Sequence, residues 1–190
     1  MTVSALTSSQ AVAMLRAASG TREPVRDTAI VAVCIDAGPH RHELVALRRR
    51  DLDPAHGLLA LGSGATRRAV RLSATTVAAV LASTSTDPGD PLLQSRSGRP
   101  FTDRVVHEQL LTVSSLAGLG HWVAARNLRR TFIAAAARKY PLAVAMRLTG
   151  HGSRPFPSAT IEQAIDAQVT PDWTSVLDDL LAQEARRLAA

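Results

Sequence analysis

Hydrophobic residues along this 190-residue chain recur mainly with helical spacing, and capping residues bound several of the runs. The Thr-Ser-Ser-Gln sequence at 7–10 places a hydroxyl at an N-cap with glutamine three residues later, which predicts a helix over 8–18 that stops at Gly20. Pro24 suits a first helical position, and the apolar run that follows ends at Gly38, a typical C-terminal stop. We expect this second helix to be central and buried.

A small β-hairpin is predicted after a short helix over 40–47 and a turn over 51–54. The segment 58–61 is a short apolar run typical of a strand, and 62–66 is typical of a hairpin loop. Apolar residues alternate with arginine over 69–72, which predicts the returning strand. Little other β structure is visible, so the expected fold class is mainly α with a small antiparallel β-hairpin.

The rest of the chain is expected to be helical, apart from a loop over 83–91. Further helices are predicted over 74–82, 103–116, 123–138, 141–149 and 158–168.

A last predicted helix carries a single apolar stripe. It opens after 170–172, and its positions i, i+3, i+4, i+7 and i+8 are Trp173, Val176, Leu177, Leu180 and Leu181. We therefore expect one domain over 1–169 and a C-terminal amphipathic helix over 170–190. The stripe is expected either to mediate formation of a homo-oligomer or to fold back on the chain's own core.

Composition is consistent with one domain in a reducing compartment. A chain of this length buries roughly 70% of its unfolded surface, which is enough for one core. Aromatic residues make up only 3%, so the core must be built mainly from Ala, Val and Leu. Cys34 is the only cysteine, which excludes an intrachain disulfide and a cysteine metal cluster. Since no apolar stretch approaches the ~20 residues that span a membrane, we expect a cytoplasmic protein with no membrane partner. We also expect no metal and no cofactor.

Positive charge is the first indication of function. The 22 basic residues outnumber the 16 acidic ones, for a net charge of +6, and all of the basic residues except Lys139 are arginine. A guanidinium group presents a fork of donors that matches phosphate oxygens, which favours a nucleic-acid partner. A high-GC coding bias would also enrich arginine. The positions of the arginines, rather than their number, must therefore indicate whether they bind nucleic acid.

Several short motifs, in this order, resemble the catalytic domain of the tyrosine recombinase (phage integrase) family. Leu-Thr at 6–7 is followed by Arg-Asp-Thr-Ala at 26–29 and Glu-Leu at 43–44. The most specific match is Leu-Arg-Arg-Thr-Phe at 128–132, followed by Thr-Gly-His at 149–151. The resemblance extends to about residue 160. It implies the recombinase catalytic fold, in which a tyrosine hydroxyl attacks a DNA phosphate.

Most of the residues that this family uses to cut DNA are replaced at the matching positions. Arg129 and His151 are retained. The family's first arginine, hairpin lysine, first histidine of the arginine helix, second histidine and nucleophile fall on His40, Ser63, Arg126, Arg130 and Thr160. Arg41 could replace the first arginine only if the turn slips by one residue, because one residue rotates a helical side chain by about 100°.

Cleavage of DNA is therefore not expected. The hydroxyl of Ser63 is far too weak an acid to replace an ammonium group as proton donor. Tyr140 is the only tyrosine and precedes Pro141 at a helix break, upstream of His151, so its expected role is structural.

The site could still hold a DNA backbone that it does not break. Guanidinium groups bind phosphate through charge-assisted, often bidentate hydrogen bonds. The segments that face DNA in this family imply contacts from Arg41, Arg48, Arg49, Arg67, Arg68, Arg96, Arg99, Arg104, Arg126, Arg129, Arg130 and His151. On the alternative interpretation, Arg126, Arg129 and Arg130 pair with Asp51, Asp53 or Asp103 on a solvated face. His107, Glu108 and Gln109 are candidate base readers by position only.

Three functions are compatible with these residues. The first is a catalytically inactive, recombinase-like protein that binds double-stranded DNA as a regulator or accessory factor in DNA transactions. The second is an active strand-transferase with a displaced active site, and the third is a protein-interaction module that binds no DNA. Family members usually carry a preceding helical domain that completes a clamp around the duplex. Because the resemblance begins at Leu6, we expect a monomer to bind weakly.

Overall fold

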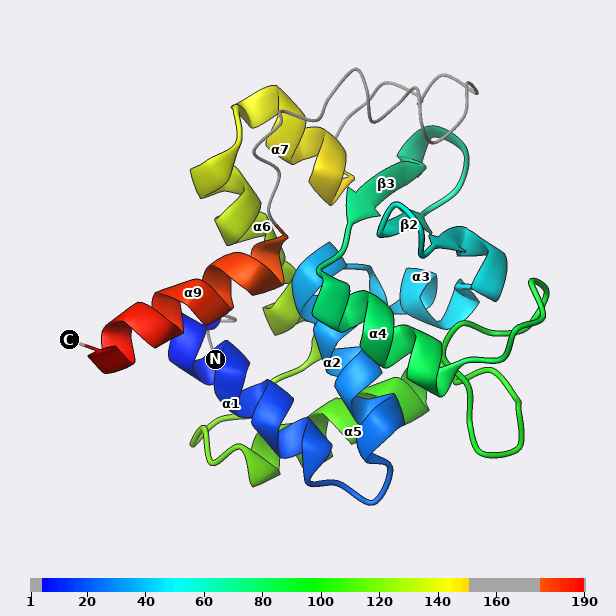
Figure 1. Ribbon diagram of the computed structural model, residues 1–190, viewed down its shortest axis with the longest axis horizontal. Coiled ribbons are helices and arrows are strands. Elements are labelled where there is room, and N and C mark those ends of the chain that lie inside the picture. Colours follow the sequence, from blue (N-terminus) through cyan, green and yellow to red (C-terminus); the bar gives the residue numbers. More distant parts are fainter. Residues whose placement is uncertain (1–4, 151–174, 190) are drawn as a thin grey trace.

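The computed structural model describes residues 5–150 and 175–189 and is organised around one buried helix (Figure 1). Helix α2 (Pro24–Ala37) runs through the centre, and every residue from Ala29 to Ala37 is buried. The helix ends at Gly38, whose left-handed backbone (φ 54°) and close approach to Phe132 leave no room for a side chain. The prediction of a central second helix with a glycine stop is confirmed.

Other helices pack around α2 or extend the bundle, close to the predicted bounds. Thr7, Ser73 and Thr102 each cap a helix by accepting a hydrogen bond from a backbone N–H, and the cap at Thr7 confirms the sequence prediction. The helices in contact with α2 are α1 (Ser8–Ser19), α4 (Ala74–Ser83), α5 (Asp103–Leu116), α6 (Ala125–Lys139) and α9 (Val176–Ala189). The remaining α-helices of the described residues are α3 (Arg41–Ala46) and α7 (Leu142–Thr149). The helix predicted over 158–168 lies outside the described residues.

A three-stranded antiparallel sheet lies beside α3 and α7 (Figure 1). Its strands, in spatial order, are β1 (Leu52–Asp53), β2 (Leu58–Leu61) and β3 (Arg68–Arg71). The hairpin is confirmed. The prediction of a simple turn over 51–54 is wrong at residues 52 and 53, which form β1. Leu52 pairs with Leu59, and so short a strand depends on that partner rather than on a local pattern.

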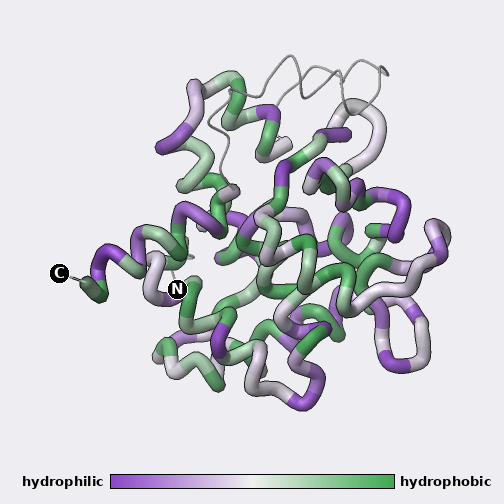
Figure 2. The backbone as a smooth tube through the Cα atoms, in the orientation of Figure 1, coloured by the Kyte–Doolittle hydropathy of each residue, from purple (hydrophilic) through white to green (hydrophobic). Residues whose placement is uncertain are grey.

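Hydrophobic positions concentrate in the interior, along α2 and the faces that pack on it (Figure 2). The core is built mainly from Ala, Val and Leu, as the composition predicts. Cys34 lies fully within it, and burial raises the pKa of its thiol to about 12. In the described ranges, no helix is both long and apolar enough to cross a membrane, and no group of three potential metal ligands occurs.

The C-terminal helix α9 packs on its own chain. Val176, Leu177 and Leu180 are buried against a core that includes α1 and α2, and Leu181 is partly buried there. These four residues are therefore covered within the chain and do not form the exposed oligomerisation surface that was one expectation for them. Trp173, the fifth residue of the stripe, lies outside the described residues.

Candidate nucleic-acid interface

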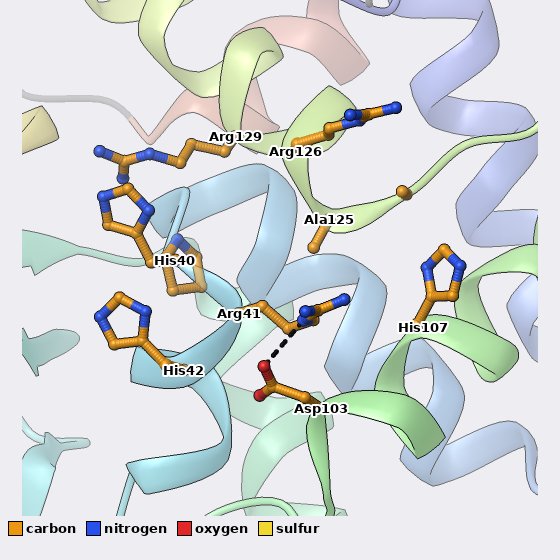
Figure 3. Close-up of a pocket in the computed structure, with 10 residues that line it drawn as sticks. His40, Arg41, His42, Asp103, His107, Ala125, Arg126 and Arg129 are labelled. Atoms are coloured by element: carbon orange, nitrogen blue, oxygen red, sulfur yellow. Dashed lines mark hydrogen bonds and ion pairs between the residues drawn. The ribbon is translucent and has the colours of Figure 1, made fainter.

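A pocket of about 540 Å³ opens where the first turns of α3, α5 and α6 meet (Figure 3). The positive ends of the α5 and α6 dipoles lie beside it, an arrangement that favours an anion. The lining residues are Pro39, His40, Arg41, His42, Asp103, His107, Ala124, Ala125, Arg126 and Arg129. Three separate parts of the sequence thus contribute one basic concavity.

Two histidines stack at the start of α3. The rings of His40 and His42 have centroids 5.3 Å apart and planes inclined by 12°. His40 is the N-cap residue, and its backbone N–H donates to the Glu43 carboxylate at 2.7 Å. The His40 ring lies next to the guanidinium of Arg129 (Figure 3). Burial and then the positive charge of Arg129 lower the pKa of His40, which favours its neutral form at pH 7.

Arg129 is an anchored, largely buried cation. Only 7% of its surface is exposed. Its Nη1 donates to the Gly38 carbonyl at 2.5 Å, and its Nη2 donates to the Thr149 carbonyl at 2.6 Å. Burial and then the charge of Arg68 lower its pKa. Arg129 therefore ties α6 to the C-terminal ends of α2 and α7 while presenting one part of its side chain to the pocket.

Arg41 does not replace the residue at position 40. Its Nε is 2.9 Å from Asp103 Oδ2, and both side chains are about half exposed, at 48% and 44%. In Figure 3 its side chain extends along a different side of the pocket from the guanidinium of Arg129. The side chain is therefore held at the pocket mouth by an acid.

Arg68 is in the interior, so the expectation that it contacts DNA directly is wrong. Its Nη1 and Nη2 donate to Glu43 Oε1 and Oε2 at 2.6 and 2.8 Å, and only 3% of the residue is exposed. Burial alone would raise the pKa of Glu43, but the hydrogen bonds and charge of Arg68 outweigh it and lower the pKa. The pair fastens β3 to α3.

A second hollow of about 520 Å³ lies on the other side of His42, between α3 and the β2–β3 loop. It is lined in part by Arg50, Ser63 and Arg67, whereas the first pocket contains Arg129. His42 borders both hollows. Ser63 and Arg129, at positions where the resemblance places two functional side chains, thus line neighbouring cavities.

The sequence profile of the phage integrase family matches residues 4–155, which is most of the chain. The chain belongs to the phage integrase family. No curated protein matches it significantly.

Solved structures of tyrosine recombinases and integrases have the same fold. XerA recombinase aligns with a TM-score of 0.66 at 19% identity, over 95% of this chain and 64% of that chain. The XerH site-specific recombinase bound to its difH substrate aligns with a TM-score of 0.65 at 16% identity, over 89% and 51%. The Tn1549 transposon integrase in complex with transposon right-end DNA aligns at 0.64 and 15%, over 100% and 67%. The chain thus spans about two thirds or less of these proteins, and the expected fold class is confirmed.

Tyr140, the one tyrosine of this phage integrase family member, lies far along α6 from the pocket. It is the C-cap residue of α6, eleven residues beyond Arg129, which corresponds to roughly 16 Å along a helix axis. Its ring is partly buried against the core, below Lys139 Nζ at 5.7 Å from the centroid. Burial and then the nearby Asp179 carboxylate raise its pKa to about 12. Its packing is consistent with the structural role predicted for it.

The remaining predicted phosphate contacts are only partly brought together. Arg126 and Arg130 are exposed on α6, and Arg67 is exposed at the hairpin. Arg96 pairs with Glu23, Arg104 Nε is 2.7 Å from Glu108, and Arg49 Nη1 donates to the Leu52 carbonyl at 3.2 Å. Arg99 is exposed and Arg48 is half-buried, and neither lines the pocket. His151 and Thr160 lie outside the described residues.

Sequence reasoning missed the pairing of His40 with His42. The available signal was the His-x-His spacing at a helix start, but a stacked arrangement requires both side chains to turn the same way. Of the three candidate base readers, His107 lines the same pocket from α5, whereas Glu108 and Gln109 do not line it.

Proposed function

We propose that this phage integrase family member is a non-catalytic DNA-binding protein, which holds the backbone of double-stranded DNA at the histidine and arginine pocket. It would act as a regulator or accessory factor in DNA transactions, in the cytoplasm and associated with the nucleoid. The separation between Arg129 and Tyr140 along α6 carries this proposal. A phosphate held at the pocket is out of reach of the chain's only phenolic hydroxyl.

Two further observations support the loss of cleavage. The high pKa of Tyr140 disfavours the phenolate that a nucleophile would need. Ser63 lines the second hollow and offers a neutral hydroxyl where the family resemblance implies a lysine. Neither residue provides the acid and base chemistry of strand transfer.

Retention of binding is supported by charge and by the structural relatives. Arg126 is exposed at the pocket on the first turn of α6, and Arg130 is exposed one turn later. Guanidinium groups at this spacing can bind phosphate oxygens through charge-assisted hydrogen bonds. The similar Tn1549 integrase is described in complex with transposon right-end DNA, and XerH is described bound to its difH substrate.

The experiment combines binding and cleavage. Affinity for a 30-base-pair duplex is measured against salt, and the same protein is incubated with a suicide substrate and run on a denaturing gel. We expect a steep decrease of affinity with salt and no covalent adduct. A covalent adduct would instead favour an active strand-transferase, and no binding at low salt would favour a protein-interaction module.

Matched variants locate the contact. Replacing Arg126 and Arg130 together by alanine should weaken binding and reduce the slope of log affinity against log salt by about 2, because each phosphate contact contributes about 1. The control replaces Arg138 and Arg186, two exposed arginines elsewhere, and so has the same net charge. Equal losses in both double variants would place the DNA elsewhere.

A further inference from the structure

Trp122, in the loop between α5 and α6, is an exposed aromatic residue with no assigned role. Its surface is 65% exposed, whereas Phe101 and Phe132 are buried and Tyr140 is half-buried. It is thus the only exposed Phe, Tyr or Trp among the described residues. An indole ring offers a large flat apolar face, and covering that face on binding is favourable.

The backbone on both sides of Trp122 is held in place. The Ser114 hydroxyl of α5 donates to the His121 carbonyl at 3.0 Å and accepts a hydrogen bond from the Val123 N–H at 3.0 Å. Val123 is fully buried, and His121 Nδ1 lies 2.9 Å from the Leu119 carbonyl. The loop is therefore organised before any ligand binds, which lowers the entropy cost of using the exposed ring.

The loop leads directly into the pocket. Ala124, two residues after Trp122, lines the pocket, and Arg126 follows on the first turn of α6. Two residues of extended chain span at most roughly 7 Å, so the Trp122 backbone lies near the pocket edge. In the chain, the buried Val123 separates the exposed Trp122 from the pocket-lining Ala124.

We propose that Trp122 stacks on an unpaired base of DNA whose backbone is held at the pocket. This inference rests on the proposed function and adds the feature of DNA that the site prefers. The basic residues beside the loop, Arg126 above all, match a phosphate chain rather than an apolar protein surface. Bases inside a duplex are already stacked, and opening them is costly, so a gap or single strand presents the base at lower cost.

The test compares two DNA probes. One is a fully paired duplex, and the other is the same duplex with a three-nucleotide single-stranded gap. Replacing Trp122 by Ala should lower affinity for the gapped probe about tenfold and affinity for the paired probe much less. The W122F variant should retain most of the preference, because phenylalanine also stacks. The control Leu188→Ala, which removes an exposed apolar residue from α9, should change neither affinity.

Fluorescence gives an independent readout. The chain has a second tryptophan, Trp173, so the measurement uses the W173F protein, in which Trp122 is the only indole. Stacking should quench its emission on addition of gapped DNA and not on addition of paired DNA at equal saturation.

The outcomes separate the two proposals. If the unaltered protein binds neither probe at low salt, the proposed function is wrong. If it binds both probes but W122A binds the gapped probe equally well and the emission of Trp122 is unchanged, the stacking inference alone is overturned.

Discussion

Arg68 and Glu43 face each other in the interior as a two-point ion pair, with Nη–Oε distances of 2.6 and 2.8 Å. The pair joins the hairpin to the short helix that carries both stacked histidines. Arg68, which was expected to contact DNA directly, therefore stabilises the position of the helix that begins beside the pocket.

Breaking this pair should destabilise the protein. Replacing either Arg68 or Glu43 by Ala should lower the free energy of unfolding by about 3–5 kcal/mol, because the remaining partner is left as an uncompensated buried charge. The double variant should lose less than the sum of the two, since no lone charge remains. Urea denaturation measures all three, and Arg67→Ala, an exposed neighbour, should stay within about 0.5 kcal/mol. Additive losses would mean that the pair is not coupled.

Arg129 should contribute to stability as well as to binding. Arg129→Ala leaves the Gly38 and Thr149 carbonyls without their donors, so we expect a loss of about 2–3 kcal/mol of unfolding free energy. Lysine at this position cannot donate in the same two-pronged geometry and should recover only part of the loss. A thermal unfolding series checks this order. If Arg129→Ala is as stable as the parent, Arg129 is not the anchor that its contacts indicate.

DNA affinity should increase as the pH falls from about 7.5 to 6. In the free protein, burial and the charge of Arg129 lower the pKa of His40, and Arg68 and His42 act in the same direction, against Glu43. A bound phosphate would favour the protonated ring, so binding would take up a proton and strengthen by at most about tenfold per pH unit. Titrations by fluorescence anisotropy at constant salt measure the effect.

The pH dependence has a matched set of variants. His40→Gln should remove most of the pH dependence, and His42→Gln measures how much of it comes from the stacked neighbour. His56→Gln, at an exposed turn between β1 and β2, should leave the dependence intact. An unchanged pH profile in His40→Gln would exclude the His40 ring as the titrating group.

Asp36 should hold the C-terminal helix against the core. Its carboxylate accepts hydrogen bonds from the Ser73 N–H at 2.6 Å and the Leu177 N–H at 3.0 Å, at the starts of α4 and α9. Asp36→Ala should lower unfolding free energy by about 2–4 kcal/mol, since two buried N–H groups lose their acceptor. Amide hydrogen exchange should accelerate first at Leu177 and its neighbours. Asp178→Ala, an exposed carboxylate on α9, is the control, and equal exchange rates in both variants would contradict the role of Asp36.

Much of the fold could be predicted because its signals are local. Thr7 and Ser73 mark helix starts through hydrogen bonds within a few residues, Gly38 marks a helix end through its own left-handed backbone, and the Leu-Arg-Arg-Thr-Phe motif at 128–132 indicated the family. The strand at Leu52 could not be predicted in the same way, because strand pairing there depends on a partner on β2.

By itself, the sequence determined the helical elements, the resemblance to a recombinase domain and the substitutions at its matching positions. Only the tertiary structure decided which arginines are available at the surface. Arg68 and Arg129 are buried and bonded to residues far away in the chain, whereas Arg126 is exposed on the same helix as Arg129. The physical reason is that a side chain's charge is a local property, but its burial and its partners depend on contacts between distant segments.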